Sequence, residues 1–265
     1  MNQPTLSDRN FDPIADHFTD KVYGGLKGDI RLAVLKKDLS QAINTLISEQ
    51  NRPLRILDIG AGLAQISIEL ADMGHEVTIN DISINMLNKA KESITESTLL
   101  ESIRWLACPY QQLADKLQGE YDLILCHALL EWLATPADII AFFQQWLSPT
   151  GKLSLCFYNP ASFIYRNLVM GNFNVLNNPN YKADNKRSLT PNNPVSYEEV
   201  SMWLEQAGFT IESVSGLRVF HDYSPLKRGG HTNPNAVVEM EVRYSTQEPF
   251  KWLGRYLHIL AKYER

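Results

Sequence analysis

The sequence predicts an α/β fold in which helices cover both faces of a mostly parallel sheet, and three observations support it. Short apolar runs alternate with segments of helical spacing along most of the chain. The first apolar run, Arg55–Ile59, passes through a turn with two glycines into the helical segment Gln65–Met73. The run Tyr121–Ala128 is almost continuously apolar, as expected of a strand buried on both faces.

Each of the other elements has a signal of its own. Apolar residues recur every three or four positions over Gly28–Ile47, which indicates a helix. Ser83 is suited to cap a helix that extends to Ile94, and Ser196 with Glu199 forms the capping-box pattern of a helix that ends at Gly208. Further helices are predicted over Asn10–Phe18, Ile139–Leu147 and Asn235–Trp252, a turn over Ser148–Gly151, and strands over Glu76–Asp81, Ile103–Cys108, Lys152–Asn159, Phe209–Val214 and Arg255–Tyr263.

Composition bounds the class of protein. A chain of 265 residues with 44% hydrophobic residues is expected to form one large domain, with or without an insertion. No apolar run is long enough to span a membrane, and the polar, acidic start of the chain is unlike a signal peptide. The cysteines Cys108, Cys126 and Cys156 lie in apolar runs, which predicts buried thiols in a reducing cytosol and no metal site. A net charge of −5 argues against non-specific nucleic-acid binding but allows a local basic face.

The glycine turn predicts a nucleotide-type site. Gly60 and Gly62 permit a tight turn and leave room for a ligand against the main chain, and Asp58 precedes them. The second strand ends in Asp81, roughly 20 residues later, which is the usual spacing for an acid that binds ribose hydroxyls. From these residues alone, an ordinary strand–helix turn and a pyrophosphate-binding oxidoreductase stay open.

Polar residues near the carboxyl ends of later strands are further site candidates. Ligands of open α/β sheets bind at that edge, which favours a site role for His127 over a packed polar residue. The run Gly216–Tyr223 places Arg218, His221 and Tyr223 directly after a strand. A turn with a purely structural role does not need so many polar side chains.

The segment at about 160–194 lies outside the alternating pattern. It combines aromatic residues with Arg166, Lys182, Lys186 and Arg187, a composition suited to stacking on an unpaired base and to binding phosphate. A merely solvated insertion is the alternative that composition leaves open.

The glycine turn also carries a resemblance. The motif Leu-Asp-Ile-Gly-Ala-Gly over 57–62, followed by Asp81, resembles the glycine motif of the class I S-adenosylmethionine-dependent methyltransferases. The motif Leu-Ser-Pro-Thr-Gly-Lys-Leu over 147–153 resembles a turn of the same family. The resemblance implies a Rossmann-like fold with seven strands, the last of them antiparallel, and S-adenosylmethionine as cofactor. It also implies that the glycine turn passes under the methionine part and that Asp81 holds the ribose.

Landmarks along nearly the whole chain narrow the resemblance to the tRNA 5-carboxymethoxyuridine methyltransferases. They include Arg-Asn-Phe-Asp at 9–12, His-Ala-Leu-Leu-Glu-Trp at 127–132, Phe-Tyr-Asn at 157–159, Gly-Asn-Phe at 171–173 and the run 216–223. The implied activity is methylation of the carboxylate of 5-carboxymethoxyuridine at the tRNA wobble position, in the cytoplasm. The implied domain is single, 1–265, with an N-terminal helical cover at about 1–50 and a substrate-side insertion at about 160–194. Carried over by position, and together with the loop residues Asp58 and Gly62, the cofactor contacts fall on Arg31, Gly60, Ala61, Asp81, Tyr110, Gln111 and His127.

The implied acceptor needs no general base, because a carboxylate is already anionic at neutral pH. It needs a positive group to hold it. Arg218 and His221 are the first candidates, followed by Arg166 and Tyr223, although Arg218 has Asp222 nearby as an alternative partner. A small-molecule carboxylate methyltransferase and a non-catalytic cofactor-binding module remain alternatives, and the sequence leaves the oligomeric state open.

Overall fold

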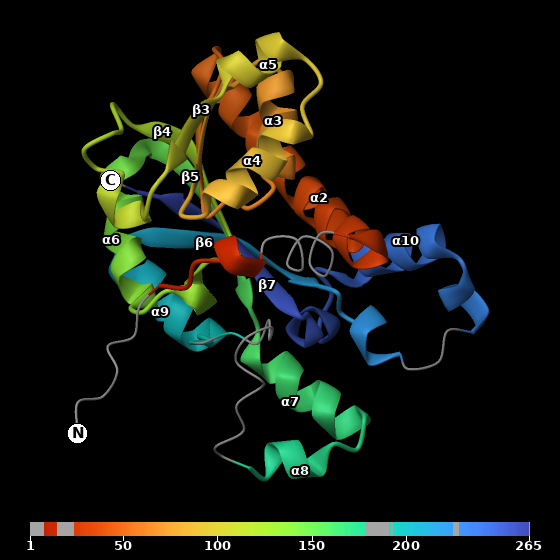
Figure 1. Cartoon of the computed structure of the whole chain (residues 1–265). Coiled ribbons are helices and arrows are strands. Elements are labelled where there is room, and N and C mark those ends of the chain that lie inside the picture. Colours follow the sequence, from red (N-terminus) through yellow and green to blue (C-terminus); the bar gives the residue numbers. More distant parts are fainter. Residues whose placement is uncertain (1–7, 15–23, 179–190, 192, 225–227, 265) are drawn as a thin grey trace.

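The computed structural model describes residues 8–14, 24–178, 191, 193–224 and 228–264. Within them, one seven-stranded sheet runs in the order β3-β2-β1-β4-β5-β7-β6 (Figure 1). The strands β1 to β5 pair in parallel, and β7 is antiparallel to both of its neighbours, β5 and β6. The strands are β1 Arg55–Ile59, β2 Glu76–Asp81, β3 Arg104–Ala107, β4 Tyr121–His127, β5 Leu147–Tyr158, β6 Phe209–Leu217 and β7 Tyr256–Tyr263. The predicted α/β fold with an antiparallel last strand is confirmed.

Helices cover both faces of the sheet, and each face has its own apolar core. One core joins the sheet to α2, α3, α4 and α10, and the other joins it to α6 and α9. The α-helices are α2 Gly25–Gln50, α3 Gln65–Asp72, α4 Ile84–Glu92, α5 Ser97–Ser102, α6 Ile139–Trp146, α7 Pro160–Val169, α8 Phe173–Leu176, α9 Tyr197–Gln206 and α10 Pro234–Tyr244. Short 3-10 turns are η1 Asp12–Ile14, η3 Tyr110–Gln112, η4 Leu130–Trp132, η5 Pro136–Asp138, η6 His221–Tyr223, η7 Gly229–Thr232 and η8 Phe250–Leu253.

Several element boundaries differ from the sequence predictions for identifiable reasons. The helix expected over Asn235–Trp252 cannot run through Pro249, which lacks an N–H donor and disfavours helical backbone just before it, and α10 ends at Tyr244. The turn expected over Ser148–Gly151 lies within β5, where the register against β4 shifts. The short helix α5 was not predicted at all. Of the helix expected over Asn10–Phe18, residues 12–14 form η1, and residues 15–18 lie outside the described part.

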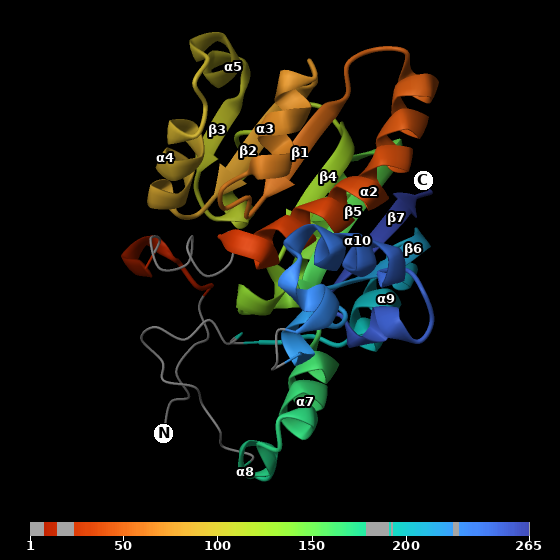
Figure 2. The ribbon, with the colours of Figure 1, turned by 90° about the vertical axis from the view of Figure 1, so that its right-hand side faces the viewer.

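The segment at about 160–194 begins with structure of its own. Asn159 caps α7 by accepting the N–H of Ala161, and Pro160 occupies the first helical position. In Figures 1 and 2, α7 and α8 project away from the sheet beyond the end of β5. The basic residues Lys182, Lys186 and Arg187, which the sequence suggested for phosphate binding, lie outside the described residues.

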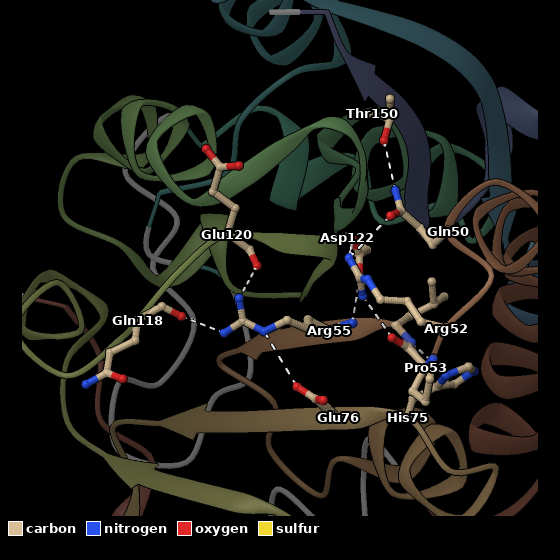
Figure 3. A network of polar contacts seen from close by, with 11 residues as sticks. Gln50, Arg52, Pro53, Arg55, His75, Glu76, Gln118, Glu120, Asp122 and Thr150 are labelled. Carbon is tan, nitrogen blue, oxygen red and sulfur yellow. Dashed lines mark hydrogen bonds and ion pairs between the residues drawn. The ribbon is translucent and has the colours of Figure 1, made fainter.

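The amino edge of the sheet, opposite to that projection, is fastened by a polar network (Figure 3). The guanidinium of Arg52 donates to both carboxylate oxygens of the buried Asp122, over 2.8 and 2.9 Å. The backbone N–H of Arg55 donates to the same carboxylate over 2.8 Å, and its guanidinium donates to the backbone oxygens of Gln118 and Glu120. This network ties β1 to β4 at the edge that carries no site candidate.

Candidate active site

The glycine turn after β1 has a backbone that requires its glycines. Gly60 has a φ of +65° and Gly62 a φ of +58°, in the left-handed region that side chains disfavour. A Cβ atom on Gly60 would also lie 2.9 Å from the side chain of Leu129. The N–H of Ala61 donates to the backbone oxygen of Asn80, which holds the turn against the end of β2.

Asp81 fixes the other side of this turn. One of its carboxylate oxygens accepts the N–H of Gly62 over 2.8 Å, and the other accepts the N–H of Ser83 over 2.7 Å. Burial raises the pKa of Asp81 to about 6, although the two N–H donors oppose that rise. The carboxylate is therefore buried, oriented by backbone donors and placed beside the glycines.

Asp58 is a second buried acid in the same region. It accepts the hydroxyl of Ser67, on α3, over 2.5 Å. Burial raises its pKa to about 7, with the Ser67 hydrogen bond opposing the rise and the negative charge of Asp81 adding to it. The two aspartates thus stand close enough to influence one another.

A first cavity, here called the turn cavity, lies over the glycines. Five of the predicted cofactor residues line it, namely Gly60, Gly62, Asp81, Tyr110 and His127. Residues of the N-terminal segment also line it, because Asp8, Arg9 and Phe11 fold over its mouth. Its volume is about 60 Å³, far below the ~300–1,000 Å³ typical of small-molecule sites.

Polar contacts hold the N-terminal segment over the turn cavity. The side-chain amide of Gln111 donates to the carboxylate of Asp8 over 2.8 Å, and Asp12 accepts the N–H of Asn85 over 3.1 Å. Gln111, predicted as a cofactor contact, therefore binds this covering segment rather than lining the cavity. Residues 1–7 and 15–23 of the expected cover lie outside the described part.

A second cavity, here called the helix cavity, lies between the glycine turn and α2. Arg31, Asp58, Ala61 and His127 line it together with residues of α3. Arg31 donates to the backbone oxygen of His127 over 3.4 Å. His127 lines both cavities, so the structure brings the two groups of predicted cofactor residues together at this histidine.

The polar run after β6 comes close to Arg31 at the ring of Tyr256. The Arg31 guanidinium lies 5.9 Å and the Arg218 guanidinium 5.4 Å from the centre of that ring. Arg218 has a φ of +60° and its side chain lies 3.6 Å from the carboxylate of Asp222. The alternative partner that the sequence left open for Arg218 is thus present in the structure.

A buried acid that sequence reasoning missed shapes this run. The carboxylate of Glu241, on α10, accepts three consecutive backbone N–H groups, from Val219, Phe220 and His221. Burial raises the pKa of Glu241, and the three donors oppose that rise. Glu241 occupies an unremarkable position in a helical pattern, so no local signal in the sequence marks it.

Positive charge gathers around tyrosines at the same edge. The guanidinium of Arg255 lies 4.9 Å from the ring centre of Tyr158, and Arg255 has no carboxylate partner among the described residues. Burial raises the pKa of Tyr158 and of Tyr223, and Arg255 lowers both. Burial lowers the pKa of Lys27. The negative charge of Asp222 opposes that change, and the positive charges of Arg218, Arg255 and Arg166 add to it. The sequence pointed to Arg166, Arg218 and Tyr223 but missed Arg255, which opens an ordinary strand.

An aromatic groove adjoins this cluster. It has a volume of about 480 Å³ and is lined by Tyr165, Val219, Phe220, Tyr223, Met240, Tyr244, Phe250 and Leu253. Tyr165 and Tyr223 meet edge to face with ring centres 4.9 Å apart. Tyr223 lines the groove, and the charge of Arg255 influences it, so the groove and the charged cluster meet at this residue.

The described part of the chain contains neither a membrane-spanning helix nor a cluster of metal ligands. No helix among the described residues is long and apolar enough to cross a membrane. No group of three or more His, Cys, Asp or Glu in the described part is arranged to hold a metal ion.

Comparison with known proteins places this geometry in context. A family model described as a methyltransferase domain matches residues 32–214. The tRNA 5-carboxymethoxyuridine methyltransferase of Escherichia coli (strain K12) is 38% identical over 257 residues, which cover 97% of each chain. A ubiquinone biosynthesis O-methyltransferase of Psychrobacter arcticus is 28% identical over 74% of this chain and 72% of the relative.

Solved structures share the fold at low sequence identity. The magnesium protoporphyrin IX methyltransferase of Synechocystis with bound SAH has a TM-score of 0.60 at 17% identity, over 96% of each chain. The plantazolicin methyltransferase in complex with a desmethyl analogue and SAH has a TM-score of 0.56 at 16% identity, over 95% of this chain and 90% of that one. These likenesses establish the architecture.

Proposed function

Because the chain belongs to the family of the tRNA 5-carboxymethoxyuridine methyltransferases, we propose that it esterifies the carboxylate of 5-carboxymethoxyuridine at the tRNA wobble position. The observation that carries this proposal is the meeting of two regions at Tyr256. Arg31, which lines a cavity beside the glycine turn, and Arg218, of a cluster of cations and tyrosines suited to an anionic acceptor, both lie near the Tyr256 ring. We propose the cytoplasm as its location, since tRNA is its substrate.

The residues of the two cavities fit S-adenosylmethionine as cofactor. The Asp81 carboxylate would accept ribose hydroxyls, and the left-handed glycines leave the main chain open to close approach. The Arg31 guanidinium, which lines the helix cavity, would pair with the carboxylate of the methionine part. When bound, the cofactor supplies an electrophilic methyl group. The small volume of the turn cavity requires that residues 8–14 shift outward for the nucleoside to enter.

The acceptor carboxylate would be held by arginines at the edge of β6 and β7. Arg218 shares its charge with Asp222, whereas Arg255 lies over Tyr158 with no carboxylate partner in the described part of the chain. We therefore assign the main hold on the substrate carboxylate to Arg255 and a supporting role to Arg218. Catalysis would come from placing the oxygen in line with the methyl group in a site that excludes water, without a general base.

The aromatic groove supports an RNA acceptor over a free carboxylic acid. Bases of an anticodon loop are unpaired, and aromatic side chains provide stacking surfaces for such bases. Tyr223 lines the groove together with Tyr165, which belongs to α7. This helix projects away from the sheet (Figure 2). A flanking base of the same loop would stack in the groove while the modified uridine enters the site.

Analysis of cellular tRNA tests this function. Total tRNA from a strain that lacks the gene, digested to nucleosides, should contain 5-carboxymethoxyuridine but not its methyl ester. Reintroduction of the wild-type gene should restore the ester, and the Asp81→Ala variant should not. The proposal would be contradicted if the methyl ester persists in the strain that lacks the gene, or if reintroducing the wild-type gene does not restore it.

A further inference from the structure

A buried series of hydrogen bonds ends at His127 and joins four elements of the fold, α2, β7, β5 and β4. The Nε2 atom of His127 lies 2.8 Å from the hydroxyl oxygen of Ser154, on β5. That oxygen lies 2.8 Å from Nε2 of His258, on β7, and Nδ1 of His258 lies 2.9 Å from the carboxylate of Asp38, on α2. Ser154 and His258 are buried, and the Asp38 side chain is only 5% exposed.

Ser154, His258 and Asp38 are hydrogen-bonded in the same order as the residues of a Ser–His–Asp catalytic triad, but Ser154 cannot act as a nucleophile. Ser154 has no exposed surface, and its single oxygen already contacts two imidazoles. A catalytic serine must instead reach a substrate carbonyl. These hydrogen bonds therefore act on His127, which lines both the turn cavity and the helix cavity, whereas Ser154, His258 and Asp38 line neither.

The directions of the protons follow once His258 is taken as neutral, with a single ring proton. A carboxylate only accepts, so Nδ1 of His258 carries the proton that it shares with Asp38. A neutral His258 then has a bare Nε2, which accepts the Ser154 hydroxyl. That hydroxyl has one proton, so its oxygen must in turn accept from Nε2 of His127. A neutral His127 with its proton on Nε2 presents a bare lone pair on Nδ1.

The surroundings of His127 disfavour a positive charge on its ring. Arg31, on α2, adds positive charge close to His127, and the rings of His127 and His258 lie 5.8 Å apart. Burial lowers the pKa of His127 well below its ordinary value, and the positive charge of Arg31 lowers it further. A second cation in this space would be unfavourable.

We propose that Asp38, His258 and Ser154 are positioning residues that orient His127 so that its Nδ1 accepts a hydrogen bond from the ammonium group of the cofactor's methionine part. This inference rests on the proposed function. Arg31 lines the same cavity and suits the carboxylate of the methionine part. Its guanidinium also donates to the backbone oxygen of His127, which is therefore already used as an acceptor. The imidazole is then the neighbouring acceptor for the ammonium.

Two ligands that differ in the amino-acid part test the proposal by calorimetry. S-adenosylhomocysteine carries the ammonium group, and 5′-methylthioadenosine lacks the amino-acid part altogether. Ser154→Ala and Asp38→Asn should weaken S-adenosylhomocysteine binding about tenfold, as loss of one well-placed hydrogen bond to a charged group would. Neither variant should change the affinity for methylthioadenosine. Equal weakening of both ligands, or no weakening of either, overturns the proposal.

A matched control and a spectroscopic readout separate positioning from folding. Ser215 is a buried serine on β6, opposite His258 in the sheet, and its hydroxyl has no partner among the described residues. Ser215→Ala should leave both affinities unchanged. Imidazole ¹⁵N NMR of the wild-type protein should show His127 protonated at Nε2 and bare at Nδ1, and the opposite assignment overturns the proposal. If the wild-type protein binds neither S-adenosylmethionine nor S-adenosylhomocysteine, the proposed function fails instead.

Discussion

At the scale of single residues, Asp81 links the cofactor cavity to pH. Burial raises its pKa to about 6, so the folded chain holds this proton more tightly than the unfolded chain does. Its contribution to stability is therefore fully present below the unfolded pKa near 4 and is lost as the pH rises through 6. The ionised form that binds ribose is thus maintained at a cost in stability, which is expected of a functional carboxylate.

We expect Asp81→Ala to weaken S-adenosylmethionine binding by about tenfold to a hundredfold, since hydrogen bonds to a charged group contribute about 1.5–3 kcal/mol. The wild-type affinity should also fall between pH 7.5 and pH 5, because protonation removes an acceptor. Calorimetry at both pH values measures this. Asp72→Ala, at the exposed end of α3, is the control. Unchanged affinity in Asp81→Ala would refute the assignment of Asp81 to the ribose.

Arg255 carries a second prediction at this scale. Arg255→Ala should lower kcat/KM for tRNA by at least about tenfold, because a bidentate hold on a carboxylate is lost. Cofactor affinity should not change, since Arg255 lines neither cavity of the cofactor. Arg218→Ala should have a smaller effect, because Asp222 already shares its charge. The exposed Arg243→Ala is the control. A larger loss in Arg218→Ala than in Arg255→Ala would reverse the two roles.

The residues that the sequence pointed to are those with a local pattern around them. Gly60, Gly62 and Asp81 follow strands at recognisable spacings, and the structure places them around one cavity. Arg255 and Glu241 stand in ordinary strand and helix patterns. Their partners, Tyr158 and the backbone of 219–221, are distant in the sequence. Such partners become visible only when the strands are assembled in order.

At the scale of elements, the run Arg218–Tyr223 depends on α10. Arg218 adopts a left-handed backbone that costs about 1 kcal/mol or more for a side chain of this kind. Three N–H groups that follow it converge on the Glu241 carboxylate, which compensates for that strain. The Glu241 carboxylate on α10 therefore holds the polar run in place.

Glu241→Gln should loosen this run, because an amide offers only one oxygen to three donors. We expect a loss of about 1–3 kcal/mol in stability and a Tm lowered by several degrees. The KM for tRNA should rise, while calorimetry should show unchanged cofactor affinity. The exposed Glu239→Gln is the matched control on the same helix. If KM stays constant while Tm falls, α10 contributes to stability alone.

Strands and long helices were predictable because their apolar periodicity survives in the sequence. The helix α7 carried an overlooked signal, since Asn159 followed by Pro160 is a typical helix start. The end of α10 before Pro249 was likewise readable from the proline. The strand register at Ser148–Gly151 was not, because the pairing of β5 with β4 decides it.

At the scale of the whole molecule, the two edges of the sheet have separate tasks. The carboxyl ends of β1, β2 and β4 carry the glycine turn, Asp81 and His127. The amino ends are fastened by the network around Asp122 (Figure 3). This separation lets stability and binding be changed independently.

Asp122→Ala should destabilise the fold by about 1–3 kcal/mol, because Arg52 and the N–H of Arg55 lose their shared acceptor. Urea unfolding measures this loss. Cofactor affinity of the folded protein should change by less than about twofold, since the network is at the edge opposite the cavities. The exposed Asp115→Ala serves as control. An affinity loss as large as that of Asp81→Ala would show that the two edges are coupled.

The most direct test of the central claim uses purified components. The protein is incubated with methyl-labelled S-adenosylmethionine and an anticodon stem–loop that carries 5-carboxymethoxyuridine, with an unmodified stem–loop beside it. The account predicts that label enters the modified RNA alone and is released by mild alkali, as a methyl ester must be. Label that is stable to alkali, that enters both RNAs equally, or that enters neither would contradict it.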